Sequence, residues 1–159
     1  MKNVVIGCDP GEAGGIAVLD GQGVIEVHKM PKTFPDIYEL LKDIQERFLH
    51  ENVTAYMENV GHGMPGQSSK ATATFARHNG HLEMAFYSLG IKTEMVTPQK
   101  WMKHYSNAVG KSSDYEKTVW KNRLKAEAQR LFPKVKVTLA ISDAILIANY
   151  GLEQLWKRC

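Results

Sequence analysis

Three acidic residues occupy positions where a carboxylate is costly to bury and useful for chemistry. Asp9 ends an apolar run that starts at Val4, and Glu58 ends a second apolar run. Asp143 lies in the first turns of an apolar helix predicted over residues 139–156. Burying such a group costs free energy unless a cation binds it, so these positions suit a divalent metal. Each acid also has a local explanation: Asp9 can open a Pro-Gly turn, Glu58 can be a solvated loop acid, and Asp143 can favour the helix dipole.

The available ligand types favour a hard metal ion. Carboxylate oxygens bind Mg²⁺ or Mn²⁺, whereas zinc prefers histidine and cysteine, and no histidine or cysteine here stands at metal-ligand spacing. The two cysteines, Cys8 and Cys159, are too far apart in sequence to suggest a disulfide framework, which favours a reducing cytoplasmic location. Carboxylates from separate elements that hold two such ions about 4 Å apart hydrolyse phosphodiesters.

The predicted elements bring two of the acids to one edge of a sheet. If a helix over 35–49 makes a right-handed crossover, the strands that end at Asp9 and Glu58 become parallel neighbours. The whole pattern predicts one α/β domain over residues 1–159, with a five-stranded mixed sheet of three antiparallel strands followed by two parallel ones, flanked by helices. The predicted strands cover 3–9, 14–20, 24–30, 53–57 and 91–96, and the other predicted helices cover 70–89, a short segment from Pro98, 115–132 and 139–156.

Charge is distributed unevenly along the chain. The net charge is +3, but residues 1–60 carry five Lys or Arg against ten Asp or Glu, and residues 111–136 carry eight against three. The basic segment suggests a polyanionic partner and the acidic one suits cations, although a solvated lysine-rich helix face gives the same pattern. No apolar stretch is long enough to span a bilayer, so no membrane is expected as a partner.

Five segments in order resemble one nuclease family. They are GCDPGEAGGIAVLD, AYMENVGHGMPGQSS, VTPQKWM, KNRLKAEAQRLFP and ISDAILIANYG, and together they extend over nearly the whole chain. The chain resembles the RuvC-like Holliday junction resolvases, especially the compact phage and prophage type. The resemblance implies a ribonuclease H-like fold, a homodimer, a bacterial and possibly phage-encoded origin, and paired symmetric nicking of branched DNA at four-way junctions. It also implies dependence on Mg²⁺, with Mn²⁺ as a substitute and two ions per site.

The resemblance assigns roles to individual residues. Asp9 would be shared by both metals, Glu58 and Asp143 would complete the metal site, and Lys121 would serve the catalytic site or the scissile phosphate. Without the resemblance, the sequence alone would indicate that Lys121 is an ordinary surface lysine. The candidate DNA-binding residues lie in the basic region, in the segment after TPQ and in the loop 59–69: Lys100, Lys103, Lys111, Lys117, Arg123, Lys125, His62, Met64 and Gln67.

The sequence departs from the better-known members of that family at three positions. Ala140 stands where they carry an acid or a histidine, which leaves His78 or His81 as candidates to help hold the second metal. Met102 stands where they have a lysine, and Gly61 stands where they have an aromatic wedge. The homodimer interface could be formed by four apolar residues of the helix predicted over 70–89: Phe75, Met84, Phe86 and Tyr87. The same residues could instead pack in the core.

Two other functions remain compatible with the sequence. A ribonuclease H-like nuclease acting on flaps, forks or RNA–DNA hybrids would need the same carboxylates. A non-cleaving junction-binding protein would use the basic region without a complete metal site. A panel of branched substrates separates the first from a junction resolvase, and tight junction binding without nicking identifies the second.

Overall fold

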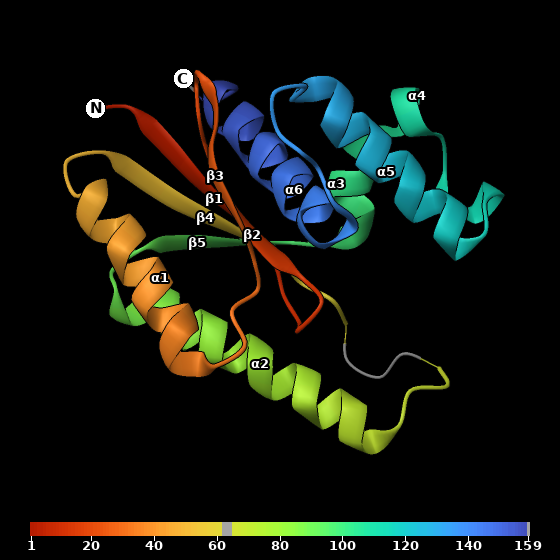
Figure 1. Ribbon diagram of the computed structural model, residues 1–159, viewed down its shortest axis with the longest axis horizontal. Helices are drawn as coiled ribbons and strands as arrows, with labels where there is room; N and C mark the ends of the chain where they lie inside the picture. Colours follow the sequence, from red (N-terminus) through yellow and green to blue (C-terminus); the bar gives the residue numbers. More distant parts are fainter. Residues whose placement is uncertain (62–64, 159) are drawn as a thin grey trace.

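The computed structural model describes residues 1–61 and 65–158, built around a five-stranded sheet of order β3-β2-β1-β4-β5 (Figure 1). Strands β1, β2 and β3 are antiparallel neighbours, while β1 pairs parallel with β4, and β4 pairs parallel with β5. This is the mixed sheet that the sequence predicts, so the predicted fold class is confirmed. The strand bounds are β1 (Asn3–Asp9), β2 (Gly15–Asp20), β3 (Gly23–Lys29), β4 (Asn52–Glu58) and β5 (Lys92–Val96).

Helices cover both faces of the sheet. The helices α1 (Phe34–Arg47) and α2 (Ser69–Ser88) form one layer, and the helices α3 to α6 lie on the opposite face (Figure 1). Thr33 and Ser68 begin α1 and α2 by accepting hydrogen bonds from backbone amides of the first turn. The elements of the second layer are α3 (Pro98–His104), α4 (Ser106–Val109), the 3₁₀ turn η1 (Ser112–Asp114), α5 (Lys117–Leu131) and α6 (Leu139–Trp156).

The region between α3 and α5 is more regular than the sequence predicts. Residues 106–113, for which the sequence predicts neither helix nor strand, contain α4 and the start of η1. The helix α5 begins at Lys117, later than expected, because Tyr115 is extended and its ring stacks on that of Trp120. The guanidinium of Arg123 lies 4.4 Å over the Tyr115 ring and fixes it further. The aromatic contact therefore replaces the first predicted turn of the helix.

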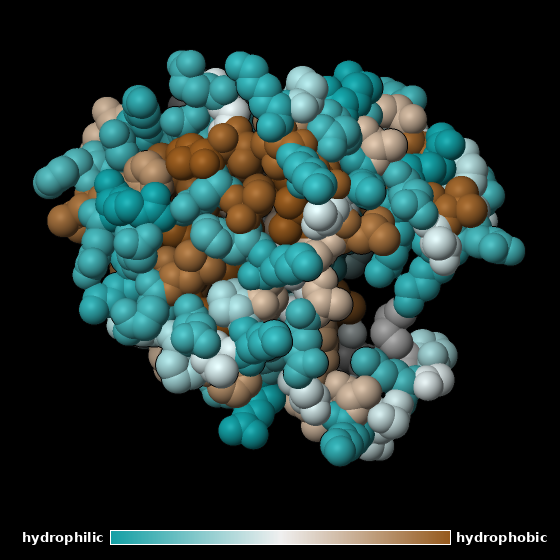
Figure 2. All heavy atoms as spheres, in the orientation of Figure 1, coloured by the Kyte–Doolittle hydropathy of each residue, from teal (hydrophilic) through white to brown (hydrophobic). Residues whose placement is uncertain are grey.

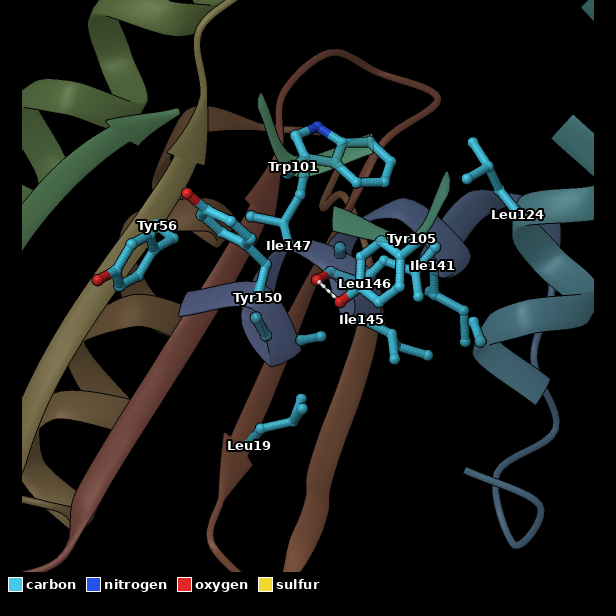
Figure 3. Close-up of a cluster of buried hydrophobic side chains, with 14 of the residues drawn as sticks. Leu19, Tyr56, Trp101, Tyr105, Leu124, Ile141, Ile145, Leu146, Ile147 and Tyr150 are labelled. Carbon is cyan, nitrogen blue, oxygen red and sulfur yellow. Dashed lines mark hydrogen bonds between the residues drawn. The ribbon is translucent and has the colours of Figure 1, made fainter. Parts of the chain in front are cut away.

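Strand alternation divides the apolar side chains between two cores. Val4, Ile6 and Cys8 pack on the side of α1 and α2, whereas Val5 packs on the side of α6. In the α6-side core, the Tyr105 hydroxyl donates a 2.7 Å hydrogen bond to the Leu146 carbonyl oxygen (Figure 3). By the same alternation, Asp9 belongs to the α6 side of β1.

The helix α6 packs unusually close to the sheet, because two strand positions on that side carry no side chain. A Cβ atom on Gly7 would overlap the Ala144 carbonyl oxygen and lie 2.6 Å from the Ala148 amide nitrogen. A Cβ atom on Gly15 would lie 2.6 Å from the Ala140 carbonyl oxygen. The two glycines therefore set how near the first turns of α6 come to β1 and β2.

No helix in the described part of the chain is long and apolar enough to cross a membrane.

We expect Gly7→Ala to lower the free energy of unfolding by about 3 kcal/mol or more, because the added methyl group collides with α6 backbone. Gly80→Ala is the matched control, since Gly80 lies in α2 and a methyl group added there would have nothing within 4 Å. That change should raise stability by up to about 1 kcal/mol. Chemical denaturation measures the free energy of unfolding of both variants. Equal changes in the two variants would contradict the close packing of α6 on the sheet.

Candidate active site

The sheet brings Asp9 and Glu58 to one edge. Each is the last residue of its strand, and the parallel register of β1 and β4 pairs Gly7 with Tyr56 and Cys8 with Met57. Asp9 and Glu58 follow those pairs directly, so they are neighbours at the carboxyl ends of the two strands. Asp143 comes from α6, one residue before the Ala144 that packs on Gly7. The predicted neighbour relation of the two strands is confirmed.

Burial raises the pKa of all three carboxyl groups, and repulsion by neighbouring carboxylates raises the pKa of Asp9 and Glu58 further. For Asp9, burial raises the pKa well above its usual value, the charges of Asp143 and Glu58 raise it further, and Lys121 lowers it. Burial, with a smaller effect from Asp143, raises the pKa of Glu58 to about 7 against the lowering effect of Trp101. Burial raises the pKa of Asp143 to about 6, although Lys121 and then Ser142 lower it. The three acids and Lys121 therefore interact as one electrostatic unit.

The donor set fits a hard divalent cation, but it is not a closed ligand cage. Within residues 1–61 and 65–158, no three His, Cys, Asp or Glu side chains form a group that could hold a metal as arranged. The fit rests on chemistry: three buried carboxylates repel one another, and the nearby cationic side chain is a single lysine. A divalent ion is the partner that offsets such a concentration of negative charge.

Trp101 holds the Glu58 carboxylate in place. Its indole nitrogen donates a 2.6 Å hydrogen bond to Glu58 Oε2, and the ring is fully buried. Figure 3 shows the indole nitrogen of Trp101 turned away from the apolar neighbours Ile147 and Tyr150. This contact joins residues 43 positions apart, and sequence reasoning missed it. The orientation of Glu58 therefore depends on α3.

His78 supports the turn that follows Asp9. Gly11, with a φ of 104°, donates its backbone amide to His78 Nδ1 over 3.2 Å. Burial lowers the pKa of His78, against the raising effect of Glu12, which suits a neutral ring that accepts this bond. The sequence offered His78 and His81 as helpers for a second metal. In the structure, His78 instead binds backbone, and His81 stacks on Phe34 with ring centroids 3.6 Å apart.

Ala140 lies in the first turn of α6, with its carbonyl oxygen toward Gly15 of β2. It is one helical turn before Asp143 and therefore on the same side of the helix. An acid there would add a ligand from the β2 side of the site. The corresponding corner of this site has no carboxylate.

The candidate DNA-binding lysines of α5 form one row. Lys117, Lys121 and Lys125 are spaced by four residues, so they follow one side of the helix, and Lys121 is close enough to Asp9 and Asp143 to lower their pKa values. Arg123 differs from them. Its Nε donates a 2.8 Å hydrogen bond to the Val109 carbonyl oxygen, so part of its guanidinium group holds α4 against α5.

The remaining DNA-binding candidates lie around a second groove and the start of α2. Lys103 and Lys111 line a groove with Trp120, whose buried indole nitrogen has no hydrogen-bond partner among the described residues. Lys100 is exposed on α3, and Gln67 is exposed just before α2. Figure 2 shows hydrophilic side chains on both sides of a hollow where the starts of α5 and α2 face each other. The two other loop candidates, His62 and Met64, lie outside the described residues.

We expect Glu58→Gln to stabilise the metal-free protein at pH 8 by about 3 kcal/mol, since a pKa raised by 1 unit corresponds to about 1.4 kcal/mol. Folding raises the pKa of Glu58 from 4.5 to about 7, so the folded state binds this proton more tightly than the unfolded chain. The contribution of Glu58 to the free energy of unfolding is therefore highest at low pH, and it falls as the pH rises from 4.5 to about 7. The glutamine amide still accepts from Trp101 without the charge.

Thermal unfolding in a chelator at pH 5 and pH 8 measures this effect, with Glu39→Gln on the exposed side of α1 as control. Added Mg²⁺ should stabilise the wild type more than Glu58→Gln. A variant that is less stable than the wild type at pH 8 in chelator would contradict the predicted cost of burying the charged Glu58 carboxylate.

Comparison with known proteins establishes the fold. No protein-family model matches the sequence, and no curated protein matches it either. The structure of RuvC from Thermus thermophilus matches with a TM-score of 0.62 and 15% identity, over 97% of this chain and 96% of that one. The T. thermophilus RuvC in complex with a Holliday junction substrate matches with a TM-score of 0.65 and 14% identity, over 98% of this chain and 94% of that one. Over nearly its whole length, the chain therefore has the ribonuclease H-like α/β fold of RuvC.

Proposed function

We propose that this protein is a divalent-metal-dependent endonuclease that resolves four-way DNA junctions, and that residues 1–159 form its single nuclease domain. The observation that carries the proposal is the electrostatic unit of Asp9, Glu58 and Asp143 at the carboxyl edge of β1 and β4. The fold is shared with a RuvC whose structure contains a Holliday junction substrate, which favours a branched DNA. The lysine row of α5 beside the carboxylates favours a polyanion at this place.

Each side chain of the site has a distinct task in this reaction. Asp9, whose pKa both other acids raise, would be shared by two Mg²⁺ or Mn²⁺ ions, with Glu58 and Asp143 as the further ligands. When bound, the ions supply an activated water and stabilise the leaving 3′ oxygen, so that water adds to phosphorus as the P–O3′ bond breaks. Trp101 keeps one oxygen of Glu58 engaged and leaves the other oxygen for a ligand role.

The cationic groups position the DNA strand. Lys121 reduces the negative charge of the site and is placed to contact the scissile phosphate. Lys117 and Lys125 continue the row along the backbone of the same strand. The groove with Lys103 and Lys111 suits a further phosphate of the backbone.

A second copy of the chain would supply the second nick. Of the apolar residues suggested for an interface, Phe86 is buried in the core, but Met84 and Tyr87 are 63% and 81% exposed on α2. They line one hollow with Met95 of the edge strand β5. We therefore assign the homodimer interface to this face of α2 and β5.

We expect Asp9→Asn to reduce Mg²⁺-dependent cleavage of a synthetic four-way junction by about 10³-fold or more, because the shared metal ligand is lost. The affinity of Asp9→Asn for the junction should stay within a few-fold of the wild-type affinity, since a neutral asparagine does not repel the DNA phosphates. Asp20→Asn at the far end of β2 is the matched control and should cleave normally.

The measurement is gel-resolved cleavage in Mg²⁺, Mn²⁺ and chelator, beside flaps, forks and RNA–DNA hybrids. Equal cleavage by wild type and Asp9→Asn would overturn the assigned site. Preference for flaps or hybrids over the junction would overturn the proposed junction substrate. Tight junction binding without any nicking would overturn the nuclease activity and indicate a junction-binding protein.

We expect Tyr87→Glu combined with Met84→Glu to give a monomer that still binds metal, because two charges replace the apolar centre of the proposed interface. Sedimentation of the variant and of a Glu46→Gln control, an exposed acid of α1 outside this hollow, measures the oligomeric state. A wild type that is monomeric at micromolar concentration, or a double variant that remains dimeric, would contradict this interface.

A further inference from the structure

A cavity of about 800 Å³ lies on the other side of the Asp9 turn from the α6 layer. It is bounded by the turn after β1, the segment that leads from β3 into α1, and the first three turns of α2. Figure 1 shows this β3–α1 segment descending from the sheet to α2. The groups that give the cavity its chemistry are Glu12, Lys32, Phe34, Lys70, Phe75 and His78.

Two cationic side chains stand in the wall of this cavity. Lys32 comes from the β3–α1 segment and Lys70 from the first turn of α2, and both are exposed. Neither takes part in the ion pairs formed among the described residues. Glu12 is the acidic residue of the lining and follows Gly11 at the turn. An anionic group in the cavity would therefore lie toward the two lysines and away from the turn.

Two phenyl rings stand in the same wall. Phe34 is 38% exposed at the start of α1, the His81 ring stacks on it with centroids 3.6 Å apart, and the Arg77 guanidinium carbon lies 6.0 Å from its ring centroid. Phe75 lies against the turn, because a methyl group on Gly11 would come 3.3 Å from its ring. Fixed aromatic rings beside free lysines are the combination that binds an unstacked base together with its phosphate.

His78 connects the cavity to the catalytic turn. It is buried, it lines the cavity, and its Nδ1 accepts the Gly11 amide proton two residues after Asp9. A ring that accepts at Nδ1 carries its proton on Nε2, which can donate to a ligand. A group that binds in the cavity therefore contacts a residue that also fixes the Asp9 turn.

We propose that this cavity binds one unstacked nucleotide of the DNA strand that enters the carboxylate site, with its base against Phe34 and Phe75 and its phosphate on Lys32 and Lys70. This inference rests on the proposed nuclease function for its biological meaning. It adds a binding site on the α2 side of the turn, separate from the lysine row of α5. The position next to the Asp9 turn makes the bound nucleotide a near neighbour of the scissile phosphate.

Binding of a short single strand tests the cavity without requiring a junction. The probe is fluorescein-labelled oligothymidylate of five nucleotides, added to the full chain in chelator and followed by anisotropy. We expect Phe34→Ala and Lys70→Ala each to weaken binding at least fivefold. The matched controls Tyr38→Ala and Lys42→Ala, an aromatic and a lysine of α1 outside the cavity, should bind as the wild type does. Equal affinities for all five proteins, or no binding by the wild type, would overturn the proposal.

A four-way junction with one abasic nucleotide then locates the captured base. We expect removal of the base at a single position beside the cleaved phosphate to weaken binding of Asp9→Asn at least fivefold. The same removal should have no effect when Phe34→Ala is added, because the missing ring and the missing base form one contact. Uniform sensitivity at every position, or an unchanged effect in Phe34→Ala, would overturn the proposal. If the wild type binds oligothymidylate but does not cleave the junction, that result would count against the nuclease function alone.

Discussion

The close contact between α6 and the β1–β2 pair is the constraint on which the rest of the structure depends. It exists because Gly7 and Gly15 leave room for helix backbone where other residues would place a side chain. The contact puts Asp143 on the same side of the sheet as Asp9 and Glu58. Three carboxylates are thereby brought into a space where burial raises all their pKa values and repulsion raises those of Asp9 and Glu58 further. The packing that builds the core thus also creates the need for a cation.

Support for the site comes from both helical layers. The α6 layer contributes the Trp101 indole, which holds one oxygen of Glu58. The α2 layer contributes His78, which holds the turn after Asp9 through the Gly11 amide. Neither group needs a charge for its task, so both orient the site without reducing its affinity for a metal. This division explains how carboxylates that repel one another can keep fixed positions before metal binds.

Sequence reasoning succeeded where a local signal coincided with the fold. The parallel neighbour relation of β1 and β4 and the strand-end positions of Asp9 and Glu58 follow from alternation and from the handedness of the crossover. The Trp101–Glu58 bond could not be predicted, because it depends on how α3 packs against α6, and no local pattern records that contact. The charge of Arg123 predicts a DNA contact, but no local pattern indicates that its Nε also anchors α4.

The central claim is that Asp9, Glu58 and Asp143 together hold the divalent ions that a junction nuclease requires. A crystal structure of the wild-type protein soaked with Mn²⁺, with anomalous differences recorded, tests this claim most directly. The account predicts anomalous peaks within bonding distance of all three carboxylates, with Asp9 shared wherever two peaks occur. Absence of Mn²⁺ from this edge of the sheet at millimolar concentration, while the ion binds elsewhere on the protein, would contradict it.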